Sequence, residues 1–327
     1  MTAAISLTGL SNEEIIAYTR WKLNQQVTTP DDSWVPDISG EVRETPNMDH
    51  FNMAWLGSTG EFVDVSIGGI VEETVSGEEI TRKYSEFGKG FRVTNKERRM
   101  GLVTEVQRRI DEKQTAYGRI WANQLLTTLK EAAAGTLTKR SKCIDDKALY
   151  ATDHPNPTGG SAISNKVSFN AAATTTLTID EAETMLWTLV ETLMGYTDDN
   201  GRAINEDADS FVLFAPWTLR RPLAYALGAQ VIIDDGGLSR TNLMAQANGM
   251  NFRLVTTTQL SAWSGSGSQV ALHIADGKSC WRARDPRSLQ VEVDDKGIQE
   301  RATVFATFEE RGIGAAEWQS AIHCTLT

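Results

Sequence analysis

The chain has 327 residues, of which 40% are hydrophobic and 23% are charged, and its net charge is −11. This length is sufficient for a sizeable core and is more typical of two lobes than of one compact domain. The acidic excess argues against general nucleic-acid binding, because such binding depends on Lys and Arg displacing counterions from phosphate. No stretch of 18 apolar residues is present, so we predict no transmembrane helix and no membrane partner.

The cysteines and the first residues of the chain place limits on its compartment. Cys143, Cys280 and Cys324 are far apart and odd in number, which predicts a reducing compartment without a disulfide framework or a zinc site. The first 14 residues contain neither the basic nor the apolar segment of a secretion signal. We therefore predict no secretory signal in these residues.

Residues 1–50 are predicted to form an arm. Ser11 and Glu14 match a capping box, which predicts a short helix that ends at about Gln25. About twenty residues with three prolines and little periodicity follow, which is unusual inside a compact domain. Two alternatives remain open: a surface loop of the same subunit, or an arm that lies on a neighbouring copy.

The segment from Gly57 to Thr94 contains seven glycines, eleven charged residues and no proline. Val63, Val65 and Ile67 alternate with polar residues, which is the period of a strand. A polar return run from Ile80 to Val93 would complete a long hairpin with an irregular tip. Because a two-stranded ribbon is only marginally stable alone in water, we expect it to lie on another copy of the same protein.

A long amphipathic helix is predicted next, from Lys96 to Ala134. Thr94 and Glu97 match a second capping box, and apolar residues recur every three to four positions for about seven turns. At 1.5 Å per residue the helix would span roughly 58 Å and form a spine of the molecule. It carries the basic residues Arg98, Arg99, Arg108, Arg109 and Lys113. We interpret them as a mixed-charge, solvated or subunit-contacting face, with DNA contact as the alternative.

The rest of the chain mixes helices and strands without a βαβαβ order, so the predicted fold class is α+β. A helix capped by Thr178 and Glu181 should end near Met194, and a second helix is predicted over Leu219–Leu227. The predicted strands are Phe211–Ala215, Arg253–Thr256, Val270–Ile274, Leu289–Val293, Ala302–Phe308 and Ala321–Leu326.

Two short motifs resemble ligand sites but lack an essential residue. Gly277-Lys278-Ser279 resembles the end of a phosphate-binding loop, but position 272 is leucine where that motif needs glycine. Asp198, Asn200 and Gly201 resemble part of a calcium loop, but its first position would be Tyr196, which supplies no carboxylate. We interpret the second motif as an acidic turn, and we predict no cofactor and no metal.

The four histidines, His50, His154, His273 and His323, show no metal-ligand spacing. Asp153 and His154 could form half of a catalytic pair, but no nucleophile motif accompanies them. A soluble hydrolase built on this pair is therefore the weaker hypothesis, and we predict a protein that is not an enzyme.

Aromatic residues in the arm and the ribbon are the predicted subunit contacts, because tryptophan is enriched at interface hot spots. These residues are Trp21, Trp34, Trp55, Phe62, Tyr84, Phe87 and Phe91. The alternative is that the tryptophans fasten the arm onto its own subunit. We predict hinges at Gly57, Gly60, Gly68, Gly69, Gly88 and Gly90, which would let the ribbon swing while the lobes stay rigid.

The order of these parts resembles the major capsid proteins of tailed double-stranded DNA bacteriophages, especially the major head subunit of Mu-like phages. Local stretches that carry the likeness are GFRVTNKERRMG, ALYATDHPNPTGG, TDDNGRAINEDADSFVLFAPWTLRRPLAYAL, TNLMAQANGMNFRLVTTTQL and RATVFATFEERGIGAAEWQSAI. The resemblance implies an N-terminal arm at 1–50 and an extension loop at 51–94. It implies a peripheral domain at 95–145 with 285–312, and an axial domain at 146–284 with 313–327.

The resemblance further implies a structural subunit that forms pentamers and hexamers of an icosahedral shell in the host cytoplasm and encloses DNA without sequence-specific binding. The shell would mature from a procapsid, with separate scaffolding and portal proteins. An encapsulin-type compartment shell is the alternative. Some members of the family cross-link a loop lysine to a neighbour's asparagine. Lys83 and Lys89 lie in the loop, but no partner asparagine can be assigned, so we do not predict cross-linking.

Overall fold

A computed structural model of the chain describes most of its residues. The described residues are 11–28, 35, 43–44, 50–56, 77–83, 85–156, 158–198, 200–228, 231–233, 239–242, 250–260, 263, 267–275, 279–285, 290–295 and 302–327. Among these residues no helix has both the length and the apolar character needed to cross a bilayer.

Helices and strands are both present in the described residues, with three successive helices after β4 and mainly strands after α7. The helices are α1 (Asn12–Thr28), α3 (Asn95–Met100), α4 (Val103–Gly118), α5 (Ile120–Ala133), α6 (Ile179–Met194) and α7 (Arg220–Gly228), with short 3-10 helices η1 (Trp217–Leu219) and η2 (Thr258–Leu260). The first strands are β1 (Arg43–Glu44), β2 (His50–Leu56), β3 (Gly77–Lys83), β4 (Ser85–Thr94), β5 (Lys166–Phe169), β6 (Ser210–Pro216) and β7 (Val231–Ile233). The later strands are β8 (Ser239–Thr241), β9 (Asn251–Thr257), β10 (Gln269–Ile274), β11 (Trp281–Asp285), β12 (Gln290–Asp295), β13 (Ala302–Ala315) and β14 (Ala321–Leu326).

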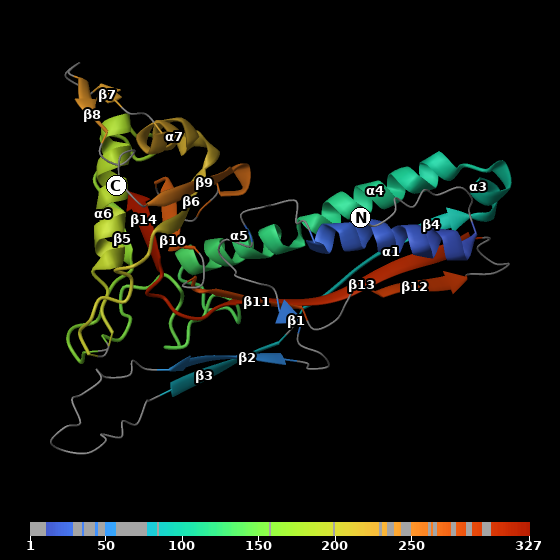
Figure 1. Cartoon of the computed structure of the whole chain (residues 1–327), viewed down its shortest axis with the longest axis horizontal. Helices are drawn as coiled ribbons and strands as arrows, with labels where there is room; N and C mark the ends of the chain where they lie inside the picture. Colours follow the sequence, from blue (N-terminus) through green and yellow to red (C-terminus); the bar gives the residue numbers. More distant parts are fainter. Residues whose placement is uncertain are drawn as a thin grey trace, which may run out of the picture.

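Two five-stranded sheets organise two lobes, and the α+β prediction is confirmed (Figure 1). One sheet has the order β5-β14-β10-β6-β9 and lies beside α6 and α7; we call this part the axial lobe. The other sheet contains β1, β11, β13 and β12, with β4 paired to β13; its elongated half, with α1 and α4, is the peripheral lobe. The long strand β13 runs from one lobe toward the other (Figure 1).

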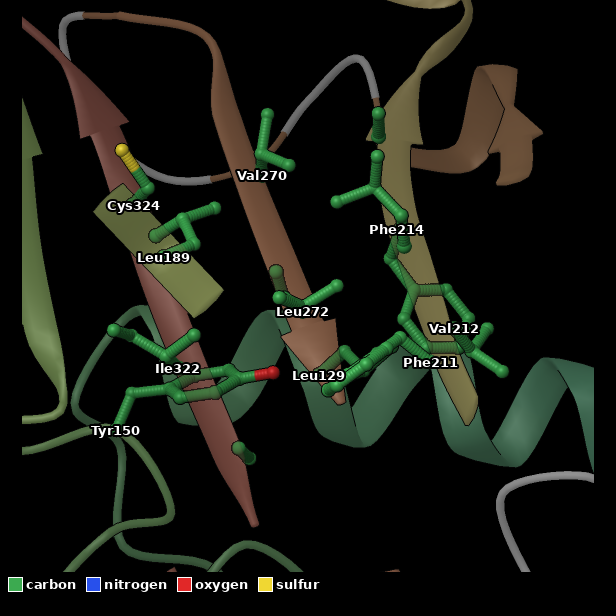
Figure 2. Close-up of a cluster of buried hydrophobic side chains, with 14 of the residues drawn as sticks. Leu129, Tyr150, Leu189, Phe211, Val212, Phe214, Val270, Leu272, Ile322 and Cys324 are labelled. Carbon is green, nitrogen blue, oxygen red and sulfur yellow. The ribbon is translucent and has the colours of Figure 1, made fainter. Parts of the chain in front are cut away.

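The axial lobe has the larger hydrophobic core. Every residue of β10 is buried, as expected for a strand covered on both faces of its sheet. Figure 2 shows Leu129 of α5 and Leu189 of α6 in one cluster with side chains of β6, β10 and β14. Because α5 belongs to this core, the helix segment from Ile120 packs with the axial sheet. The predicted boundary at residue 145 therefore does not coincide with the boundary of the core.

The peripheral lobe has a smaller core, in which two helices cover one sheet. Helices α1 and α4 lie side by side over β4, β13 and β12 (Figure 1). Their buried residues meet those of the strands in the cluster Ile15, Tyr18, Phe91, Val93, Val106, Ile110 and Phe305. The rings of Phe91 and Phe305 stack with centroids 5.2 Å apart, which joins β4 to β13 across the ladder.

The predicted single spine helix is wrong in one respect, because the structure divides it into α3, α4 and α5. Gly101 ends α3 in the left-handed region at φ 63°, and its N–H bonds the carbonyls of Arg98 and Glu97. Glycine is the residue that adopts this conformation at little cost, so it stops the helix at this point. A second interruption follows Gly118, where Arg119 leaves regular geometry before α5 begins. After the short helix α3, the spine therefore consists of two aligned helices (Figure 1). Helix α4 belongs to the peripheral core and helix α5 to the axial core.

The predicted hairpin is also revised. The outgoing strand that the structure describes is β2, before Gly57, and it pairs antiparallel with β3 from His50↔Lys83 to Leu56↔Gly77. The predicted strand over residues 63–67 lies outside the described residues. Most of the return run does not pair with the outgoing strand at all, because β4 pairs with β13 of its own chain from Ala302↔Thr94 to Arg311↔Ser85.

Lys113 is a buried charge in the peripheral core. It is 7% exposed, its Nζ donates to the carbonyl oxygen of Lys89 at 2.5 Å, and it lies 4.7 Å from the centroid of Phe91. Burial, and then the charge of Lys89, lowers the pKa of Lys113 from 10.5 to about 8. Between these values the unfolded chain binds a proton that the folded chain does not, so the free energy of unfolding should rise with pH across this window.

We therefore expect Lys113→Met to raise the free energy of unfolding at pH 7, by up to roughly 3 kcal/mol, and to flatten the profile between pH 8 and 10.5. The carbonyl of Lys89 keeps a donor, because Thr307 Oγ1 lies 2.8 Å from it. Urea denaturation of unassembled subunits at several pH values measures the effect, with the exposed Lys96→Met as control. A less stable Lys113→Met variant with an unchanged pH profile would contradict it.

Candidate assembly interfaces

The ribbon β2–β3 is the first candidate interface. It forms a two-stranded sheet of its own, and neither strand joins the ladders of the two larger sheets. Figure 1 shows it along the lower side of the molecule, outside the two layered lobes. A ribbon of this kind has unpaired backbone groups along both edges and needs a surface to stabilise it. A neighbouring subunit can supply that surface.

The structure describes only part of the predicted interface set. Trp55 lies in β2 opposite Glu78, and Phe87 lies half-buried in β4 opposite Glu309. Phe91 is 8% exposed and packs inside its own subunit, so its ring is not available to a neighbour. The positions Trp34, Phe62 and Tyr84, and the hinge positions Gly57, Gly60, Gly68 and Gly69, lie outside the described residues.

The two remaining predicted hinges, Gly88 and Gly90, lie inside a regular ladder. Gly88 is paired with Phe308 and Gly90 with Ala306. A Cβ at Gly90 would meet Val304 and Phe305 at ordinary contact distances, 3.5 and 3.6 Å. Their hinge role remains a prediction without support from this geometry, because β13 holds both residues in place. Proline at these positions would break the ladder of the isolated subunit and would not report on a hinge.

The helix of the arm packs on its own subunit. Ser11 and Glu14 form the predicted capping box, with the Glu14 N–H donating to Ser11 Oγ at 3.2 Å. Tyr18 lies in the peripheral core and its hydroxyl accepts from Gln107 Nε2 at 2.9 Å. Trp21 is partly buried against the same core, 5.7 Å from the ring of Tyr18. For this helix the structure therefore favours the alternative to a subunit contact: Trp21 fastens the arm to its own subunit.

The basic residues of the spine largely engage the same chain. Arg98 donates to Asn12 and to Thr303 Oγ1, and Arg109 donates to Glu97 and to the carbonyl of Arg92. Arg108 lies 3.2 Å from Glu105 and 3.8 Å from Glu112, and Lys113 is buried. Arg99 is exposed. These contacts favour the predicted mixed-charge face over DNA contact, because four of the five cations have partners in their own subunit.

The Asp153–His154 pair of the hydrolase hypothesis does not form. Asp153 pairs with Lys147, whereas His154 Nδ1 lies 2.6 Å from Asp145 Oδ2 and Nε2 lies 3.2 Å from Asn165 Oδ1. The imidazole is fully buried and stacks on Trp318 with centroids 4.4 Å apart. Within the described residues no hydroxyl or thiol side chain is hydrogen-bonded to it, so the arrangement is that of a packed structural histidine.

The calcium-like motif is a closed acidic turn, as interpreted. Asp198 Oδ1 accepts the N–H groups of Asn200 and Arg202, each at 2.9 Å. Gly201 has φ 76°, which the turn requires and which glycine adopts without strain. In the part of the chain that the structure describes, no group of three His, Cys, Asp or Glu residues is arranged to hold a metal ion. Residues 277 and 278 of the phosphate-loop-like motif lie outside the described residues.

Exposed apolar side chains at opposite ends of the molecule were not singled out from the sequence. Trp217 is 51% exposed and Tyr225 is 49% exposed in the axial lobe, on η1 and α7. Met100 and Leu102 are exposed at the turn between α3 and α4 in the peripheral lobe. A helical pattern around α7 could have found the first pair, because Leu219, Leu223 and Ala226 occupy the buried face and leave two aromatic residues on the outer one.

Solved structures with the same arrangement of elements are capsid chains. A chain from the capsid of cyanophage P-SCSP1u has a TM-score of 0.54 at 10% identity, with 89% of this chain and 87% of that chain covered. A chain from the capsid of Myoviridae phage XM1 has a TM-score of 0.52 at 17% identity, with 88% and 89% covered. The chain therefore has the fold of tailed-phage capsid subunits. The fold resemblance inferred from the order of parts is confirmed.

A third similar structure is not from a tailed phage. The virus-like particle from Pyrococcus furiosus has a TM-score of 0.50 at 10% identity, with 94% of this chain and 98% of that chain covered. At the level of sequence, no family model matches this chain and no curated protein matches it. The likeness therefore lies in the path of the chain.

Proposed function

We propose that the chain is the major capsid subunit of a tailed double-stranded DNA phage and that its copies close into an icosahedral shell. The observation that carries the proposal is the capsid-subunit fold, matched over nearly nine-tenths of this chain and of the phage chains. The separate ribbon β2–β3 supports it, because such an element needs a partner surface. A Mu-like head and maturation from a procapsid are the finer form of the proposal.

In this account the subunits associate head to tail, which closes a ring when the rotation between copies is a whole fraction of a turn. The ribbon of one copy lies over the spine helices of the next. Each contact is modest, but several per subunit multiply into a durable shell. The net charge of −11 makes the chain a weakly repulsive wall, which suits enclosed DNA that must later leave. Portal and scaffolding proteins are the proposed separate partners, and closure of the shell depends on the subunit itself.

A protein compartment shell of the encapsulin type is the second candidate. The observation that keeps it open is that a virus-like particle from Pyrococcus furiosus, a source other than a named phage, shares the fold over 98% of its chain. The two candidates differ in what the shell contains, and in both the chain acts structurally.

For the first candidate, the proposed setting is a phage head assembled in the cytoplasm of a bacterial host.

Electron microscopy of the chain expressed alone in bacteria tests the proposal. We expect closed shells of uniform diameter, because the subunit carries its own ribbon and its own ring contacts. If material purified from phage-producing cells holds nuclease-protected DNA, the phage candidate is favoured. Shells that enclose an enzyme instead would favour the compartment, and a field without particles at high concentration would overturn both.

A further inference from the structure

Helix α7 and the adjoining turn η1 present an outer face made of two aromatic rings and two guanidinium groups, which we call the α7 face. Arg220 Cζ lies 4.4 Å from the ring centroid of Trp217, and Arg221 Cζ lies 6.0 Å from that of Tyr225. All four side chains are exposed, whereas Leu219 and neighbouring residues anchor the opposite face in the axial core. Trp, Tyr and Arg are the residue types that dominate interface hot spots. This α7 face has the composition of a binding surface.

The cations of the α7 face have no anionic partner in the described part of their own chain. The described ion pairs include neither Arg220 nor Arg221. A guanidinium that stacks on an aromatic ring keeps its N–H edge free for a carboxylate. Each arginine can therefore stack on its aromatic ring and form a bidentate salt bridge at the same time. A carboxylate from another subunit would complete that salt bridge.

A matching acidic surface lies at the other end of the same lobe. Glu206 and Asp209 are exposed in the turn that leads from α6 into β6. The turn is fixed from beneath by Asn205, which is buried and donates to the carbonyls of Leu193 and Gln319, each at 2.8 Å. A turn whose backbone is already held in place loses little freedom when it binds, which favours a specific contact.

The strand β6 separates the two surfaces. It begins at Ser210, directly after the acidic turn, and ends at Pro216, directly before η1 and α7. Seven extended residues span roughly 20 Å, so the surfaces cannot meet within one subunit. Figure 1 shows α7 at the upper end of the axial lobe. One copy therefore offers cations at one end of the lobe and carboxylates at the other.

Building on the proposed function, we propose that the α7 face of one copy binds the Glu206–Asp209 turn of the next copy around each ring. The contact is head to tail, as ring closure requires. A contact of two α7 faces would instead place four guanidinium groups together, and like charges disfavour that pairing. DNA phosphate also attracts arginine, but the acidic turn on the same lobe and the net charge of −11 favour a carboxylate partner.

A charge-exchange experiment tests this contact. Arg220→Glu with Arg221→Glu, or Glu206→Arg with Asp209→Arg, places like charges across the contact. We expect each pair to reduce the yield of sedimenting particles at least about tenfold, because like charges across a contact are strongly disfavoured. All four changes together restore opposite charges, and we expect particles to return. Lys139→Glu, on an exposed residue outside both surfaces, is the matched control for charge reversal.

The outcomes separate this contact from the proposed function. If the unaltered chain forms no particles, the proposed function fails. If the unaltered chain assembles and both reversed pairs assemble equally well, only this contact is wrong. Assembly at normal yield with reduced DNA content for Arg220→Glu with Arg221→Glu would identify DNA as the occupant and overturn the contact. Circular dichroism of the subunits checks folding, and each reversed pair tests the contact independently if the other fails to fold.

Discussion

A subunit whose ribbon β2–β3 is replaced by a flexible Gly-Ser linker is expected to fold but not to assemble. Residues 51–82 would be removed, which eliminates the sheet formed by β2 and β3 and leaves both five-stranded ladders complete. The subunit then loses a contact that is repeated at every copy of the shell. Because many weak contacts multiply in a closed assembly, the particle yield should fall at least about 100-fold.

Two measurements decide this prediction. Circular dichroism and a cooperative thermal transition should show that the shortened subunit is folded, and light scattering should show that it stays small. The matched control is the same linker inserted between Gly159 and Gly160, in an exposed turn of the full chain. Normal particles from the shortened chain would show that the ribbon is dispensable, and the proposed role of the ribbon would then be wrong.

Acidification is expected to destabilise the axial lobe before carboxylates titrate. Burial, with the charge of His323 as the next cause, lowers the pKa of His273 from 6.5 to about 3. Burial, and then the charge of Lys166, lowers the pKa of His323 to about 3. The unfolded chain binds protons that the folded chain does not between these values, so stability present above pH 6.5 is lost as the pH falls toward 3.

The hydrogen bonds around His273 give the physical reason. Its Nδ1 accepts from Trp281 Nε1 at 3.2 Å, so that nitrogen must keep its lone pair. Its Nε2 lies 2.5 Å from the hydroxyl of Tyr150. Protonation of Nδ1 would break the bond from Trp281. The N–H of His273 and the N–H of Trp281 would then face each other in a fully buried site. The neutral ring is therefore part of the packed core.

The expected size follows from the pKa values. A pH of 5 lies 1.5 units below the pKa of 6.5 that each histidine has in the unfolded chain. The two histidines together therefore lower the free energy of unfolding by roughly 4 kcal/mol at this pH. Urea denaturation of unassembled subunits at pH 7 and pH 5 measures this difference. His323→Gln should remove about half of it. Equal stability at the two pH values would contradict the assignment.

Local signals in the sequence predicted local structure well. The capping boxes at Thr94 with Glu97 and at Thr178 with Glu181 both form, because each side chain needs to reach only three residues along the backbone. The strand Ala321–Leu326 has its predicted bounds. The observed strand β6 extends its prediction by one residue at each end. Each of these elements has a periodicity or a cap within a few residues.

Long-range pairing could not be read from the sequence in the same way. The glycine-rich segment before β4 predicts a hairpin, yet the partner of β4 is β13, more than 200 residues later. The alternation of Phe51, Met53 and Trp55 is a local strand signal for β2. The apolar spacing around Gly101 predicts one continuous helix, whereas the glycine itself, a common helix stop, ends α3.

The same difference between local and long-range signals applies to the candidate interfaces. Composition predicts a ribbon over residues 57–94, whereas the structure describes the ribbon β2–β3, whose outgoing strand precedes Gly57. The opposition of the α7 face and the acidic turn could not be predicted, because it depends on both surfaces being fixed to the two ends of β6. Phe91 illustrates the reverse error, since an aromatic residue in a polar run proved to be part of the subunit core.

Sedimentation velocity of the purified, unaltered chain tests the central claim most directly. We expect megadalton particles in equilibrium with few free subunits, because ring contacts and ribbon contacts act together in each copy. The shortened subunit without β2–β3 should sediment in the same experiment as a monomer or a small ring. A stable 36.0 kDa monomer from the unaltered chain at high concentration would contradict the account.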